Sequence, residues 1–446
     1  MTEALQTLQE TQSLFHVLGS GSDTEPLWMT QLRQQAWEDY SQLPEPPAPQ
    51  RNLRKIPVLE LASLKAPAHV ESKSLAERQA DWGDLAGSIQ NSNASVFSQN
   101  LTETLQSQGV ILMPLTQALT DQAELVSKVF NTVAPARDKD VLLNLACWQN
   151  GVFLYVPANV QIELPLYFLQ NLQGDSQALF SRSLVIVERH ASITVIQDAY
   201  SESVSNSERT SFASEVCEWI LAEGAQVNLL SLQQWSNQIH GKSFQYAKLA
   251  RNAHFYSLAI ESGSQYHLNH IAVNLEQAGA ETRLLGLMIA QNDQHLRQST
   301  LQNHLAPHTN SHLQYHSVLR DQAYSFYNGM IYVDTIAQQT ESNQLSKSLL
   351  LSEQARADAI PNLEILADDV QSGHGSAIGS IDAEQLFYLQ SRGFEHETAE
   401  NMLVEAFMEE VILQFPAKDL HAAIKSHLAL RLIEQDEQDE TEDAVC

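Results

Sequence analysis

A small residue recurs at nearly constant spacing in the middle of the chain, after a polar corner and before a strand-like run. Ala225, Ala253 and Ala280 are 28 and 27 residues apart (225 to 253, 253 to 280), and Ala191 occupies a similar corner earlier. Repeats of about 20 to 50 residues are typical of solenoids, in which each coil stacks on the previous one. If about 220 residues wind at about 25 per coil, we expect roughly nine coils. An antiparallel sandwich with regular strand spacing is the alternative that this spacing leaves open.

The texture of the sequence divides the chain into four parts. Residues 1–140 are expected to be mainly helical, with a proline-rich linker near 44–50. Residues 141–380 change to short runs of period two, such as "RSLVIVERHASITVIQ", and are expected to form the solenoid core. Residues 381–433 contain amphipathic helices, and residues 434–446 form an acidic tail of the kind that is usually disordered.

The charge balance and the cysteines limit the environment and the partners. The chain has 25 Lys and Arg against 54 Asp and Glu, a formal net charge of -29. A field of this sign repels phosphate-coated partners, so nucleic acid and anionic membranes are excluded. Cys147, Cys217 and Cys446 form no close pair, which suits a reducing compartment. The N-terminus has no basic start followed by an apolar core, and we therefore expect a cytoplasmic protein.

The sequence carries no strong signature of an enzyme. A phosphate-binding G-x-x-x-x-G-K-[ST], a G-x-S-x-G elbow and a G-x-G-x-x-G after a strand are all missing. Parallel β-helices often act on polysaccharides with paired carboxylates, but Asp368 and Asp369 are adjacent and would point to opposite faces of a strand.

Four histidines spaced by four residues form the most tempting metal motif. On a helix they would share a face and could bind zinc, but Pro307 and the surrounding period of two argue against a helix. In a strand they could still form a row on one face of the solenoid, and the alternative to a metal site is polar, hydrogen-bonded positions in its coils. These residues are His304, His308, His312 and His316.

A long ordered run then resembles a known family. The run "LAPHTNSHLQYHSVL" is followed by "FYNGMIYVDTIAQQTESNQLSKSLLLSEQARADAIPNLEILADDVQSGHGSAIGSIDAEQLFYLQSRGF", and together they closely resemble the SufB/SufD family of the SUF iron-sulfur cluster assembly system. The resemblance is dense from about residue 300 to 415 and thinner at 143–166 and 26–36. The family pattern before the C-terminal helix is His-Gly in SufD and His-Glu-Ala in SufB, so His374-Gly375 indicates a SufD-like member.

The resemblance implies a mainly β fold, a right-handed parallel β-helix flanked by N-terminal and C-terminal helical domains. It also implies a non-catalytic scaffold subunit that pairs with a SufB-like subunit through the β-helix. Its C-terminal helices would bind the ABC-type ATPase SufC, which hydrolyses the ATP. A homodimer could form when the SufB-like subunit is absent. From the fold alone, the alternative is a solitary β-helical carbohydrate-binding or polysaccharide-cleaving protein.

The resemblance further implies a metal ligand. In SufD-like proteins the histidine of this motif lies at the SufB interface and is implicated as a ligand of the nascent cluster, so His374 takes that role. The iron-sulfur cluster would be transient and shared with SufB, with none bound by this chain alone. Imidazole replaces cysteine on one iron of Rieske centres, so such a ligand is chemically reasonable. The family commonly has a cysteine where this chain has Ser372, and one thiol is therefore missing.

The C-terminal helices are expected to carry the ATPase-docking surface. Exposed Tyr and Arg are typical residues of binding hot spots, and we expect Asp382 to act also as the helix N-cap. The predicted docking residues are Asp382, Gln385, Phe387, Tyr388 and Arg392 on one helix and Phe407 on the next. The alternative for the two phenylalanines is that they fill the small helical core.

Overall fold

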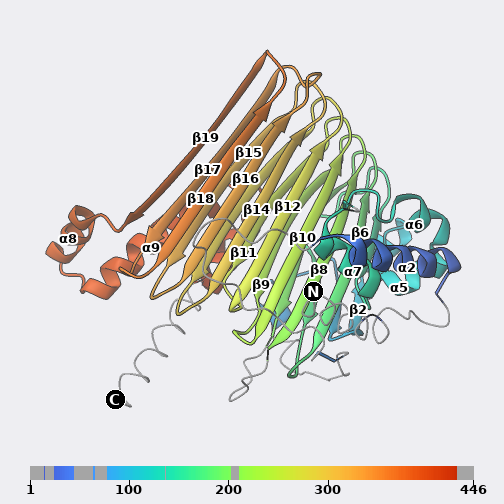
Figure 1. Ribbon diagram of the computed structural model, residues 1–446, viewed down its shortest axis with the longest axis horizontal. Helices are drawn as coiled ribbons and strands as arrows, with labels where there is room; N and C mark the ends of the chain where they lie inside the picture. Colours follow the sequence, from blue (N-terminus) through green and yellow to red (C-terminus); the bar gives the residue numbers. More distant parts are fainter. Residues whose placement is uncertain are drawn as a thin grey trace.

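The centre of the molecule is a parallel β-solenoid built from two sheets (Figure 1). The computed structural model describes residue 15 and residues 25–44, 64–65, 78–135, 137–201 and 210–428. Successive strands alternate between the sheets, so the strands from β4 to β19 make about 8 coils. The predicted solenoid is confirmed. It has fewer coils than expected because each is longer, and β12, β14 and β16 begin 29 residues apart (266, 295, 324).

Each sheet is a single ladder of mostly parallel strands. The first sheet has the order β19-β17-β15-β13-β11-β9-β7-β5-β1-β2, and the second has the order β18-β16-β14-β12-β10-β8-β6-β4-β3. The strands of the first sheet are β1 (Gly87–Ser92), β2 (Ser95–Leu101), β5 (Leu166–Asn171), β7 (Ser192–Tyr200), β9 (Gln226–Gln234), β11 (His254–Glu261), β13 (Glu281–Ala290), β15 (Asn310–Leu319), β17 (Thr340–Leu350) and β19 (Val370–Ser380). Those of the second are β3 (Ile111–Pro114), β4 (Val152–Val156), β6 (Ala178–Val187), β8 (Ser211–Leu221), β10 (Ile239–Leu249), β12 (Tyr266–Leu275), β14 (His295–His304), β16 (Tyr324–Val333) and β18 (Arg356–Ile365).

The recurring alanines mark the corners of the coils. All four are 0% exposed, and the residue before each one has a positive φ, for example 53° at Asn252 and 76° at Gly279. Gly and Asn adopt this left-handed conformation more readily than other residues. The small alanine then fits beneath the bend, which explains why the two features recur together.

The interior of the solenoid is apolar near these corners and polar on the opposite side. In β12, for example, the inward residues change from His267 and Asn269 to Ile271, Val273 and Leu275. From β4 to β13, the aliphatic halves of the strands join one continuous cluster with the corner alanines. The polar half leaves amides, hydroxyls and a few ionisable groups inside the coils.

The N-terminal part differs from the predicted mainly helical module. Its helices are α2 (Leu27–Gln42), α4 (Glu103–Ser107), α5 (Leu115–Asp121), α6 (Ala123–Val129) and α7 (Lys139–Cys147). However, β1 and β2 extend the first sheet and β3 extends the second, so both sheets begin well before residue 141. The sequence of β1, "GSIQNS", lacks the alternation of a half-buried strand because all its residues are buried. The predicted linker near 44–50 lies, apart from residue 44, outside the described residues.

After α8 (Ala383–Ser391), the C-terminal helices return to the outer face of the first sheet. They are α9 (His396–Ile412), the 3-10 helix η2 (Lys418–Leu420) and a helix at 421–428. Apolar residues of α9 join a cluster on this face that also contains Trp82, whose ring centroid lies 5.7 Å from that of His427. The predicted acidic tail at 434–446 lies outside the described residues. Over the described ranges, every helix is too short or too polar to span a bilayer.

Candidate functional site

The last coil of the solenoid leaves two strand edges open. Among the described strands, β18 and β19 each pair with one neighbour in their own sheet. Their residues are largely exposed, unlike those of the inner coils, and the exposed side chains include Ile360, Ile365 and Ile378. An open edge presents unpaired backbone N–H and C=O groups that can pair with another chain. We call β18 and β19 together the open end.

His374 lies in the middle of β19, at the open end. It pairs in register with Gln344 of β17, whose side chain is buried inside the solenoid. Paired residues of neighbouring parallel strands lie on the same side of a sheet, so His374 continues this inward-facing column. It is nevertheless exposed, because no further coil of the described chain covers it. Two residues earlier, the Ser372 hydroxyl lies 2.7 Å from that of Ser342.

Helix α8 projects away from the sheets (Figure 1), and none of its residues is buried. The Asp382 carboxylate accepts hydrogen bonds from the backbone N–H of Glu384 at 2.8 Å and of Gln385 at 3.3 Å. This confirms the predicted N-cap and supplies acceptors for two N–H groups that a helix start leaves unpaired. Asp382 therefore has a structural role within α8 itself.

The exposed surface of α8 carries large aromatic side chains. Phe387 is 71% exposed and Tyr388 is 56% exposed. Arg392 Nη2 donates a hydrogen bond to the Tyr388 hydroxyl at 3.1 Å, and the guanidinium carbon lies 5.1 Å from the centre of the tyrosine ring. Aromatic and arginine side chains grouped in this way are characteristic of protein interfaces.

Phe407 is placed differently from the other predicted docking residues. Its half-buried ring stacks on His316 of β15 with a centroid separation of 4.3 Å, and its backbone oxygen accepts a hydrogen bond from His316 Nδ1 at 2.8 Å. Burial lowers the pKa of His316 to about 4, so the imidazole is neutral near pH 7. The ring thus helps to hold α9 on the solenoid, and a docking role for Phe407 stays a prediction.

Further polar contacts fix α9 to the solenoid, and the sequence analysis missed them. Lys347 Nζ lies 2.8 Å from a Glu410 oxygen that also accepts a hydrogen bond from Gln314 at 2.9 Å. The bond from Lys347 lowers the pKa of Glu410. Arg320 forms a second ion pair with Glu400 at 3.3 Å. These contacts join residues about 60 to 100 positions apart, and no local pattern marks them.

The four regularly spaced histidines do not share a face. His304 is buried inside the solenoid, where its ring bonds to two hydroxyl groups, and His308 occupies a corner with a φ of 58°. His312 and His316 point outward to contact the segment around α9. The motif therefore serves structure at several places, and the zinc alternative has no support in this geometry.

The described thiols are poorly suited to hold a cluster. Burial raises the pKa of Cys147 to about 12 and also raises that of Cys217. Both side chains are buried, whereas an iron-sulfur cluster needs accessible thiolates. In the described part of the chain, no group of three or more His, Cys, Asp or Glu residues could hold a metal ion. Within the described residues, His374 therefore has no set of further ligands for a cluster.

Comparison with known proteins finds relatives over most of the chain. It is 26% identical over 407 residues to the iron-sulfur cluster assembly protein SufB of Bacillus subtilis, covering 88% of this chain and 87% of that protein. It is 28% identical over 339 residues to an iron-sulfur cluster assembly SufBD family protein of Staphylococcus saprophyticus, covering 76% and 72%. A SufBD family protein of Staphylococcus aureus is similar to the same extent.

Two family models match adjoining parts of the chain. Residues 87–168 match the SufBD protein N-terminal region, which contains the strands that begin both sheets. Residues 168–407 match the SufBD core domain of SUF system FeS cluster assembly, and this match covers more than half of the chain. The match extends from β5 through the open end to α9. The chain belongs to the SufBD family of SUF-system iron-sulfur cluster assembly proteins.

Proposed function

We propose that the chain is a SufD-like, non-catalytic scaffold subunit of a cytoplasmic SUF complex, on which an iron-sulfur cluster is assembled. The observation that carries this proposal is that two surfaces are left largely exposed in the described chain, namely the open end and α8. The assignment as SufD-like, rather than SufB-like, rests on the His374-Gly375 pair. Membership of the SufBD family argues against the carbohydrate-binding alternative.

The open end is the surface that pairs with a SufB-like subunit. Strand edges and exposed isoleucines there offer both backbone pairing and apolar contact. Pairing would cover His374 and continue the solenoid into the partner. When the SufB-like subunit is missing, a second copy of the chain could occupy the same edges and form a homodimer.

Helix α8 is the surface that binds a SufC-like ABC ATPase. Burying Phe387 and Tyr388 against a partner would contribute about 1.5–3 kcal/mol for each ring. Arg392 and Gln385 add hydrogen-bond donors at the rim, while Asp382 holds the start of the helix. The partner hydrolyses ATP, and its conformational change would be transmitted to the solenoid through α9.

The cluster is the cargo of this complex, and His374 is its one ligand from this chain. The position of His374 at the mouth of the solenoid places its imidazole against an incoming subunit. Thiolates of the SufB-like subunit would supply the other ligands.

An anaerobic co-expression pull-down with the SufB-like and SufC-like proteins of the same organism tests the two partner-binding roles separately. The full chain should capture both partners. A chain ending at Ser380 should retain the SufB-like subunit and lose the ATPase. The double variant Y388A/R392E should weaken ATPase binding in calorimetry, whereas I336A should leave it unchanged, because Ile336 is 64% exposed but lies in the turn after β16.

The ligand role requires a second readout. H374A should assemble with both partners but carry less iron and sulfide, and the exposed His396 at the start of α9 provides the matched control H396A. Equal iron and sulfide contents in the wild-type, H374A and H396A complexes would show that His374 is not a ligand. Failure of the full chain to capture either partner would overturn the scaffold assignment.

A further inference from the structure

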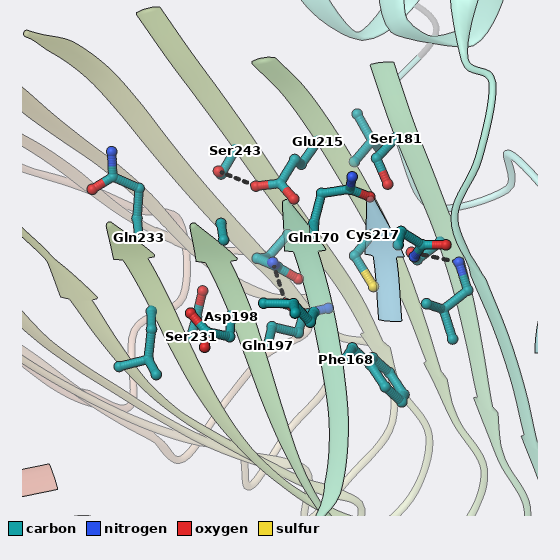
Figure 2. Close-up of a pocket in the computed structure, with 18 residues that line it drawn as sticks. Phe168, Gln170, Ser181, Gln197, Asp198, Glu215, Cys217, Ser231, Gln233 and Ser243 are labelled. Atoms are coloured by element: carbon teal, nitrogen blue, oxygen red, sulfur yellow. Dashed lines mark hydrogen bonds between the residues drawn. The ribbon is translucent and has the colours of Figure 1, made fainter. Parts of the chain in front are cut away.

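A small cavity lies inside the first coils of the solenoid. Its volume is about 50 Å³, enough for roughly three to five species of the size of a water molecule. Figure 2 shows its lining, to which β1 and β4 to β10 contribute. Most polar groups in this lining are neutral amides and hydroxyls, among them Gln170, Gln197 and Ser243.

Two acidic residues line the cavity, and they differ in their partners. Lys, Arg and His are absent from the lining. The Asp198 carboxylate is bound by Arg78 Nε at 2.6 Å and by the Tyr167 hydroxyl at 2.7 Å, so its charge is balanced. Glu215 accepts a hydrogen bond from the Ser243 hydroxyl at 3.3 Å and forms no ion pair within the described residues.

His267, a basic residue that acts on Glu215, already contacts another carboxylate. His267 Nδ1 contacts the Glu261 carboxylate, and His267 Nε2 lies 3.1 Å from Ser243 Oγ. Asn269 donates a further hydrogen bond to Glu261 at 2.8 Å. His267 can carry at most one positive charge, so it cannot balance both Glu261, which it contacts, and Glu215. The described residues therefore give Glu215 no cation of its own.

The surroundings of Glu215 disfavour a bare charge. The pKa of Glu215 is raised from 4.5 to about 7, mainly by burial and also by Glu261 and Asp198, while His267 and the Ser243 hydrogen bond oppose the rise. At higher pH the partly buried carboxylate would be an uncompensated anion inside the solenoid, which is unfavourable. A positively charged ligand in the cavity would remove this penalty.

The polar atoms in the cavity that can still accept a ligand are amide oxygens. Asn91 is 2% exposed, and its Oδ1 has no hydrogen-bond partner within the described residues. The Oε1 atoms of Gln170 and Gln197 accept bonds from Asn150 and Gln245, and each amide oxygen retains a second lone pair. Neutral oxygens of this kind hold K⁺ in channel filters. With a single uncompensated carboxylate, the site suits a single positive charge.

We propose that the cavity binds one monovalent cation of the size of Na⁺ or K⁺. The carboxylate of Glu215 is its charged ligand, and amide oxygens of the lining and water complete the coordination. The cation stabilises the first coils of the solenoid. This site is separate from the open end and from α8, and it does not depend on the role of either surface.

Equilibrium unfolding of the full chain at pH 8 tests the site. At constant ionic strength, KCl and NaCl are compared with tetramethylammonium chloride, whose cation is too large for the cavity. Above the dissociation constant, each tenfold increase in K⁺ or Na⁺ should raise the folding equilibrium constant by up to about tenfold. E215Q should abolish the difference between salts, and E341Q should preserve it, because Glu341 is exposed on β17.

Crystals soaked with Tl⁺, which has the charge of K⁺ and scatters X-rays strongly, provide a direct second readout. One anomalous peak in the cavity of the wild-type chain supports the proposal even if E215Q fails to fold. Equal unfolding midpoints in all three salts, together with no peak in the cavity, would overturn it. The charge of Glu215 would then be neutralised by a proton alone.

Discussion

The ion pair between Arg182 and Glu218 is the contact whose loss should damage the solenoid most. Both side chains are 0% exposed, and Arg182 Nη2 lies 2.9 Å from the Glu218 carboxylate. The same carboxylate accepts backbone N–H groups of Asn131 at 3.0 Å and Val133 at 3.1 Å, so it ties the segment before α7 to β8. Replacing Arg182 with methionine keeps most of the volume but leaves Glu218 buried without its cation.

The expected loss follows from this geometry. Breaking a buried pair by removing one partner costs about 3–5 kcal/mol, and R182M should lower the free energy of unfolding by that amount. The double variant R182M/E218Q removes both charges and should recover about 2 kcal/mol of the loss. Urea unfolding followed by tryptophan fluorescence measures both free energies. A loss below about 1 kcal/mol for R182M, or no recovery in the double variant, would refute the reasoning.

Three further predictions concern the interior and α9. The pKa of Glu215 is raised to about 7, against 4.5 in the unfolded chain, so between these values the folded state holds a proton that the unfolded state releases. In tetramethylammonium buffer, the free energy of unfolding measured with urea should therefore fall by roughly 2–3 kcal/mol from pH 5 to pH 8. E215Q should flatten this profile. G286A should cost about 1–3 kcal/mol, because its new carbon would lie 1.9 Å from a tyrosine ring, whereas G373A, with nothing within 4 Å, should unfold at nearly the wild-type urea concentration. H316A removes a hydrogen bond and a stacked ring from Phe407, so amide exchange in α9 should accelerate by about 30-fold while the inner strands stay protected.

The coil period could be predicted from the sequence because its cause is local. At the four alanine corners a residue with a positive φ is followed by a small one, and both are visible as neighbours in the chain, as in Asn252-Ala253. The helix cap at Asp382 was predictable for the same reason. The strand β1 was not, because its polar residues are buried by β5, about 80 positions later.

The interior chemistry also depends on distant neighbours. In "SEVCEWIL" the alternation places Glu215, Cys217 and Trp219 on one side of β8, and an isolated glutamate there suggests a solvent-facing strand position. In the structure that side faces inward, since Trp219 is 0% exposed. The groups that surround Glu215, such as Ser243 and His267, come from later coils. No pattern within one strand reveals which charged residue a solenoid encloses.

The contact between Trp82 and His427 has a consequence for the chain during its synthesis. Each coil needs only strands from its own part of the sequence, so coils can form in order as they leave the ribosome. The contact of Trp82 with His427, however, can form only after a residue 345 positions later has been synthesised (82 to 427). At about 5–20 residues per second, this delay is roughly 20 to 70 s. During that time the apolar outer face of the first sheet is bare, and the nascent chain is most vulnerable to aggregation and most open to chaperones.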